Sequence, residues 1–240
     1  MLLQMPADES AFLLLAGHMQ NELNSLNKVF AWCVANPSPA NTSDIEHLAN
    51  GMQAMIYARI LAGKLLEAWE VLSKAYFSSK LAQRVEARLK SDAHGALKKI
   101  KSYFGRSNTI HRVRNSFAFH YSVEEFNKHW LEAADESSFD LIAGGTAGNN
   151  LFAAGELVAN TALLNGINSD NKADALTRFF DDVHAVATSF TQFLEGTIVA
   201  ILEEQTGAGL ATLGREEEIF PKRRYCEITI PFFYKIDSDK

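Results

Sequence analysis

Apolar residues recur at steps of three and four along several long segments, and this periodicity constrains the fold more than any other feature of the sequence. Residues 8–35 and 172–204 show it most clearly, because their apolar side chains would share one face of a helix. With 47% hydrophobic residues, the chain can bury such faces against one another. The pattern predicts an all-α fold: an antiparallel helical bundle with additional C-terminal helices and a short extended C-terminal tail.

Helix-breaking residues mark the expected ends of the helices. Pro37 and Pro39 end the first helix, because proline cannot continue the helical hydrogen-bond ladder. A glycine-rich turn at 144–148 and a loop at 166–171 interrupt the later pattern. The expected helices are 8–35, 44–77, 80–104, a fourth from near Ile110 to Trp130 or Leu131, 151–164 and 172–204.

We expect a single domain over residues 1–240. Its core bundle covers roughly residues 8–165, the additional helix covers 172–204 and the tail covers 210–240. The run Tyr225–Phe233 is rich in residues that favour extended structure, so this part of the tail is expected to pack on the bundle or on a neighbouring chain.

The sequence favours a cytoplasmic protein without a membrane partner. The apolar run Phe12–Leu15 is too short to span a bilayer, and Asp8 and Glu9 precede it where a secretory signal would be positively charged. Cys33 and Cys226 are far apart and have no metal-ligand spacing, which predicts reduced thiols and no structural zinc.

Charge is segregated along the chain. Residues 80–129 contain eleven Lys or Arg and four Asp or Glu, a formal charge of +7. The remainder carries 12 basic and 25 acidic residues, a formal −13 that gives the chain its net −6. A basic segment in an acidic protein is the pattern expected where a nucleic-acid backbone binds locally, although a solvated lysine-rich helix face would also produce it. The residues expected to contact RNA are Lys98, Lys99, Lys101, Arg106, Arg112, Ser116 and Tyr121.

The stretch Arg114–Tyr121 carries the chemistry suited to metal-independent RNA cleavage. The imidazole of His120 can move a proton near neutral pH, and the guanidinium of Arg114 can stabilise a negatively charged phosphorane. Asn115 can orient the phosphate or the imidazole. No carboxylate cluster with metal-ligand spacing lies nearby in the sequence, so neither a metal nor another cofactor is expected.

The spacing of these residues sets a geometric condition on such a site. On a regular helix, residues six apart are about 9 Å apart along the axis and about 120° apart around it, so Arg114 and His120 would not share a face. Three arrangements would bring them together: Arg114 precedes the first regular turn, its long side chain curls round, or a second copy completes the site across a two-fold axis. The third arrangement makes a homodimer the expected assembly.

A purely structural interpretation of the same stretch stays open. Phe117 and Tyr121 are four residues apart and Phe119 is close to both, so aromatic packing explains much of the composition. Judged by composition alone, His120 could be a hydrogen-bonded structural residue.

The motif resembles the signature of the HEPN superfamily (higher eukaryotes and prokaryotes nucleotide-binding), in which Arg and a polar residue are followed by His. Arg114-Asn115 and His120 match it, and Arg-Asn-x-x-Ala-Phe-His-Tyr is similar to the AbiU2-like branch associated with phage abortive infection. The segment Arg59–Glu70 is also similar to that branch, and the resemblance covers roughly residues 8–165.

The resemblance implies a helical bundle that often dimerises and, in many members, a metal-independent endoribonuclease acting in defence or as a toxin. Arg114 and His120 would then be catalytic and Asn115 supporting. Other members are non-catalytic nucleotide-binding or interaction proteins, which is the alternative expectation. Some members pair with an antitoxin or regulatory protein that modifies a tyrosine two positions after the histidine; here Tyr121 follows His120 directly and Ser122 takes the next place.

Overall fold

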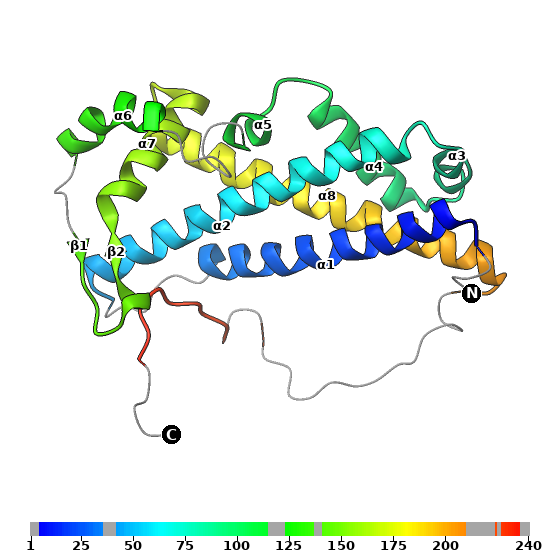
Figure 1. Ribbon diagram of the computed structural model, residues 1–240, viewed down its shortest axis with the longest axis horizontal. Helices are drawn as coiled ribbons and strands as arrows, with labels where there is room; N and C mark the ends of the chain where they lie inside the picture. The colour runs from blue at the N-terminus through cyan, green and yellow to red at the C-terminus, as the bar shows by residue number, and fades with distance from the viewer. Residues whose placement is uncertain are drawn as a thin grey trace. The chain divides into compact units, whose positions relative to one another are not determined.

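The computed structural model of the protein describes residues 5–35, 42–114, 123–136, 141–209, 224 and 227–235. The predicted all-α helical bundle is confirmed, since helices make up nearly all of the regular structure (Figure 1). The helices are α1 (Ala7–Ala35), α2 (Asp44–Val71), α3 (Lys80–Glu86), α4 (Ser91–Phe104), α5 (Thr109–Val113), α6 (Val123–Glu136), α7 (Ala153–Asn168) and α8 (Lys172–Thr206). Two short strands, β1 (Leu141–Ile142) and β2 (Leu151–Phe152), pair antiparallel.

Most predicted helix boundaries agree with the structure to within a few residues. The expected second helix, 44–77, is observed as α2 followed directly by a π-helical turn at Leu72–Tyr76. The expected third helix, 80–104, is wrong as a single element, because α3 ends at Glu86 and α4 begins at Ser91. Lys90 adopts an extended conformation (φ −65°, ψ 160°) that no helix interior accommodates.

Side chains at helix starts explain where α2 and α3 begin. Before α2, the Ser43 backbone N–H donates to Glu46 Oε2 (2.8 Å), and the Glu46 N–H donates to Ser43 Oγ (3.3 Å). This reciprocal pair is a capping box, which satisfies two amides that have no intrahelical partner. Before α3, Ser79 Oγ accepts a hydrogen bond from the Ala82 N–H (3.0 Å).

The chain divides into two compact units, each built from discontinuous segments. Unit 1 comprises residues 1–27, 64–108 and 182–222, and unit 2 comprises residues 28–63, 109–181 and 223–240. Helices α1, α2 and α8 each contribute residues to both units. The prediction of a single domain stays a prediction.

Unit 1 has an aromatic core. Tyr76 is fully buried, stacks on Phe12 with ring centroids 4.8 Å apart and meets Phe193 edge to face at 5.9 Å. Gly196 of α8 brings that helix against α4, because a Cβ on this glycine would lie 2.3 Å from the Cβ of Ala93. Aromatic pairing and this close approach fix how the helices of unit 1 pack.

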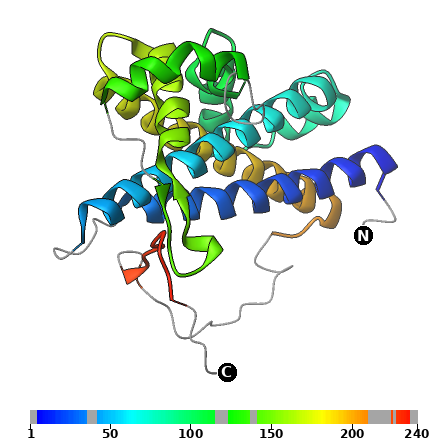
Figure 2. The same ribbon diagram turned by 60° about the vertical axis from the view of Figure 1, so that its left-hand side comes forward.

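Helix α7 is the packing surface of unit 2. Both α5 and α6 pack against it, and β2, which pairs with β1, leads directly into it (Figure 2). Arg59 of α2 is 8% exposed and pairs with Glu156 in the first turn of α7, with Nη2 and Oε2 2.6 Å apart. Helix α7 is therefore held both by apolar packing and by a largely buried ion pair.

Among the described residues, α8 is long and apolar enough to cross a membrane by length and composition. Half of its most apolar window is buried inside the structure, as in the core helix of a soluble protein. Such a helix is weak evidence for a membrane span, and a cytoplasmic location stays a prediction.

Candidate functional site

Arg114 directly follows α5, and α5 is firmly attached to α7. Ile110 and Val113 of α5 are buried, which places the apolar side of this short helix in unit 2. Nη1 of Arg112 donates to the carbonyl oxygen of Gly166 in α7 at 3.2 Å. The Arg114 side chain is half-buried and its Nε is shielded from solvent, so the guanidinium starts from an anchored backbone.

Four of the predicted site residues, Asn115, Ser116, His120 and Tyr121, lie outside the described residues. The distance from Arg114 to His120, and with it the two-fold arrangement, stays a prediction. What the structure does describe is the helix on either side of the motif: α5 before it and α6 after it, both packed on α7 within unit 2.

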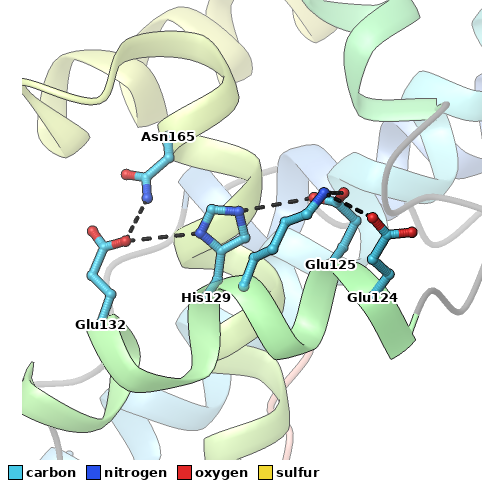
Figure 3. Close-up of polar contacts among 6 residues, drawn as sticks. Glu124, Glu125, His129, Glu132 and Asn165 are labelled. Atoms are coloured by element: carbon cyan, nitrogen blue, oxygen red, sulfur yellow. Dashed lines mark hydrogen bonds and ion pairs between the residues drawn. The ribbon is translucent and has the colours of Figure 1, made fainter.

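Helix α6 carries a polar cluster around His129 (Figure 3). The imidazole lies between two carboxylates of its own helix, with Nε2 3.8 Å from Glu125 Oε2 and Nδ1 3.8 Å from Glu132 Oε2. Asn165 of α7 donates from Nδ2 to Glu132 Oε2 at 2.7 Å. Lys172, the first residue of α8, reaches the other oxygen of Glu132 with Nζ at 3.2 Å. Glu132 thus joins α6 to α7 and α8.

Two side chains of α6, Glu132 in this cluster and the neighbouring Lys128, have shifted pKa values. The pKa of the Glu132 carboxyl is lowered, chiefly by the hydrogen bond from Lys172 and further by the one from Asn165. The pKa of Lys128 is raised by its hydrogen bonds to Glu125 and Glu124. We interpret the contacts of Glu132 as fixing the rotation of α6 against α7; α6 is the helix that follows the motif in the sequence.

The sequence-based choice of site residues did not include this cluster. Its signal in the sequence is the spacing Glu125–His129–Glu132, because residues four and three apart on a helix are neighbours. The bond from Asn165 had no such signal, since it joins residues 33 positions apart and depends on α6 packing against α7.

The predicted RNA-contacting lysines form an exposed basic surface on α4. Lys98, Lys99, Lys101 and Arg106 are all exposed. Lys101 is partly neutralised, since its Nζ is 3.3 Å from Glu86 Oε1 and lies 4.6 Å above the Phe77 ring. Within the described part of the chain, no carboxylate forms an ion pair with the other three cations.

These basic residues do not all fall in one unit. Lys98, Lys99, Lys101 and Arg106 belong to unit 1, whereas Arg112 and Arg114 belong to unit 2. The four residues on and after α4 therefore share unit 1, whereas the two arginines lie in unit 2, Arg114 being the first residue of the motif.

A cavity of about 460 Å³ adjoins the basic surface in unit 1. It lies between α4 and α8, and its lining includes Lys99, Tyr103, His184 and Thr188. Oη of Tyr103 donates to Asp182 Oδ2 at 2.9 Å, which fixes the phenol at the edge of the cavity. Apolar side chains such as Ile100 and Val186 line it beside these polar groups, and its volume is in the range of small-molecule sites.

Over the described ranges, no group of three or more His, Cys, Asp or Glu side chains is arranged to hold a metal ion. The His129 cluster is no exception, because its groups are occupied by contacts to one another and to Lys128, Asn165 and Lys172.

No protein-family model, curated protein sequence or solved structure matches the chain.

Proposed function

We propose that the protein is a metal-independent endoribonuclease of the HEPN type, acting in the bacterial cytoplasm in phage defence or as a toxin. The observation that carries the proposal is the placement of Arg114. It follows a helix anchored on α7, and His120 lies six residues later, before α6, which packs on the same helix. A guanidinium and an imidazole six residues apart in the sequence, between two helices that pack on α7, suit phosphoryl chemistry.

The proposed reaction is an intramolecular transesterification. The 2′-hydroxyl of a ribose attacks the adjacent phosphorus while His120 moves a proton, and Arg114 stabilises the negative charge that develops on the phosphorane. The bond from phosphorus to the 5′-oxygen breaks, which leaves a 2′,3′-cyclic phosphate on one product and a 5′-hydroxyl on the other. Asn115 would orient the phosphate or the imidazole.

RNA would be bound through its phosphates. Lys98, Lys99 and Arg106 supply positive charge that no described carboxylate neutralises, which supports attraction of a polyanion. Lys101, Arg112, Ser116 and Tyr121 complete the proposed RNA-contacting set.

A second copy of the chain is the proposed assembly partner, because two copies would pool two pairs of Arg114 and His120. Helix α6 exposes Val123 (76%), Trp130 (46%) and Leu131 (60%) to solvent. Exposed apolar side chains of this size are typical of surfaces that oligomers cover. Their position on the helix that follows the motif supports a dimer with both sites near its interface.

The proposal is tested by incubating purified protein with mixed RNAs and comparing Arg114→Ala and His120→Ala with wild type. Both substitutions should abolish cleavage and any growth toxicity while circular dichroism stays unchanged. Arg178→Ala is the matched control, because this arginine is 61% exposed and, among the described residues, pairs locally with Asp174 at 2.9 Å. Undiminished cleavage by the double variant would refute the assignment.

The alternative is a non-catalytic nucleotide-binding protein of the same fold, which the cavity between α4 and α8 favours. A phosphate could meet Lys99 there, and Tyr103 and His184 offer rings and hydrogen-bonding groups to a base. Protein that leaves diverse RNAs uncut, yet binds a nucleotide in titration calorimetry and loses binding in Lys99→Ala, would replace the first proposal with this one.

A further inference from the structure

The described C-terminal segment, Glu227–Lys235, docks on unit 2 (red in Figures 1 and 2). Phe232 and Phe233 are half-buried and meet edge to face, with ring centroids 5.0 Å apart. They pack on an apolar cluster drawn from α2, β1, β2 and α7. Its members are Ala49, Met52, Ile142, Leu151, Ala153 and Leu157.

Two side-chain amides hold the backbone of this segment. Oδ1 of Asn149 accepts a hydrogen bond from the Tyr234 N–H at 3.1 Å, and its Nδ2 donates to the Tyr234 carbonyl at 2.6 Å. Oδ1 of Asn50 accepts from the Phe232 N–H at 2.9 Å. One carboxamide that both accepts from and donates to a single residue replaces the partner strand of a sheet. Such contacts recognise extended backbone, and pockets for alternate side chains supply selectivity.

The loop that carries Asn149 is shaped around this contact. Asn149 is 8% exposed and lies in the 3₁₀ turn Ala147–Asn149. A Cβ on Gly144 would be 2.3 Å from the Cβ of Asn149, so only glycine lets the loop close on the asparagine. A Cβ on Gly148 would be 2.3 Å from Oη of Tyr234, so this glycine makes room for the tyrosine.

The docked segment has almost no regular structure of its own. Residues 228–235 form no helix or strand, so the contacts above, rather than internal hydrogen bonds, hold the segment in place. Asn50 is 182 residues away from its partner in the sequence and Asn149 is 85 residues away. The residues that receive the segment therefore all lie in other parts of the chain.

We propose that Asn50, Asn149 and the apolar cluster form a peptide-binding site for a short extended segment with two adjacent aromatic residues. The chain's own Glu227–Lys235 is the resident ligand, and an external peptide of the same pattern can replace it. The proposal is independent of endoribonuclease activity, because none of its residues belongs to the motif or to the basic surface.

The first test is hydrogen exchange on the full chain. The amides of Phe232 and Tyr234 should be protected in wild type. Protection should fall by about tenfold or more in Asn149→Asp, whose carboxylate meets the Tyr234 carbonyl with no donor. Exchange at the rate of an unstructured peptide in wild type would overturn the proposal.

The second test measures binding in trans. Full-length protein with Phe232→Ala and Phe233→Ala, in which the resident segment is weakened, should bind a fluorescent Glu227–Lys235 peptide in an anisotropy titration. Binding should be lost for a peptide with both phenylalanines replaced by alanine, and for protein that also carries Asn149→Asp. In wild-type protein, excess peptide should displace the resident segment and so raise the rate of hydrogen exchange at the Phe232 and Tyr234 amides. This measurement keeps the test valid if the variant folds poorly. No peptide binding to the variant, together with no change in exchange of the wild-type segment, would refute the proposed peptide-binding site.

Discussion

The guanidinium of Arg59 and the carboxylate of Glu156 lie 2.6 Å apart and join the middle of α2 to the first turn of α7. The side chain of Arg59 is 10% exposed and that of Glu156 is 25% exposed, so most of the pair is shielded from water. The negative carboxylate also lies at the helix N-terminus, where the helix dipole favours it. This pair fixes the start of the helix on which α5 and α6 both pack.

Arg59→Met should destabilise the protein by about 2 to 4 kcal/mol, because it leaves a shielded carboxylate without its cation. Urea unfolding followed by circular dichroism measures the change. The double variant Arg59→Met, Glu156→Leu should recover much of the loss, since it leaves neither charge behind. Arg178→Met is the control in the same unit and should change stability by less than about 1 kcal/mol, as expected for an exposed pair. Equal losses in Arg59→Met and Arg178→Met would contradict a special role for the pair.

Gly196→Ala should destabilise the protein by about 1 to 3 kcal/mol, because the added methyl group overlaps Ala93 of α4. Gly95→Ala is the matched control on α4, where nothing lies within 4 Å of the added Cβ. That change should be neutral or stabilise by up to about 1 kcal/mol through helix propensity. Thermal unfolding measures the change in stability of the two variants. A destabilised Gly95→Ala with a neutral Gly196→Ala would contradict the close packing of α4 against α8 at Gly196.

The long helices could be predicted from the sequence because most of their apolar residues at helical spacing are buried, whereas Leu15, Ile45 and Leu48 are exposed. Phe12, Phe30 and Phe190 are buried where the periodicity predicts. The break between α3 and α4 could not be predicted, because no proline or glycine marks residues 87–90. Arg84 and Arg88, on either side of the end of α3, both pair with Glu204 of α8, at 3.6 and 3.3 Å. Tertiary contacts therefore accompany a break that local preference does not encode.

The candidate site, like the fold, could be predicted only in part from the sequence. The residue types and spacing of Arg114 and His120 are visible in the sequence, as is the basic character of α4. The buried pair of Arg59 with Glu156 and the docking of Tyr234 on Asn149 join residues 97 and 85 positions apart. No local pattern predicts such partners, because they meet only after α2, α7 and the β1–β2 turn have packed.

Glu132→Gln should lower stability at pH 7 by about 0.2 to 1 kcal/mol, the range of exposed ion pairs. The pKa of Glu132 is lowered in the folded protein from its ordinary value of 4.5. Its contribution is therefore complete above about pH 4.5 and is lost as the pH falls through the lower folded value. Urea unfolding should show a smaller difference between wild type and variant at pH 3 than at pH 7. The same substitution in a Lys172→Met background should have a smaller effect, and an equal effect would show that Lys172 is not the cause.

Lys98→Glu with Lys99→Glu should weaken RNA binding and reduce its salt dependence, because both side chains are exposed and have no described acidic partner. For single-stranded RNA, the slope of log K against log salt should fall by about 0.7 for each phosphate that the variant no longer neutralises. Lys74→Glu is the control, since this lysine is 77% exposed and pairs with Glu70 at 3.3 Å outside the basic surface. Equal loss of affinity in both variants would indicate a non-specific charge effect.

The chemistry of the RNA ends tests the central proposal most directly. Wild-type protein is incubated in EDTA with an end-labelled RNA and with the same RNA carrying a 2′-deoxy sugar at the cleaved position. The ribo-substrate should give 2′,3′-cyclic phosphate and 5′-hydroxyl ends, the 2′-deoxy substrate should stay intact, and His120→Ala should cleave neither. Products with 5′-phosphate ends that disappear in EDTA, or an absence of cleavage by wild type, would contradict a metal-independent endoribonuclease.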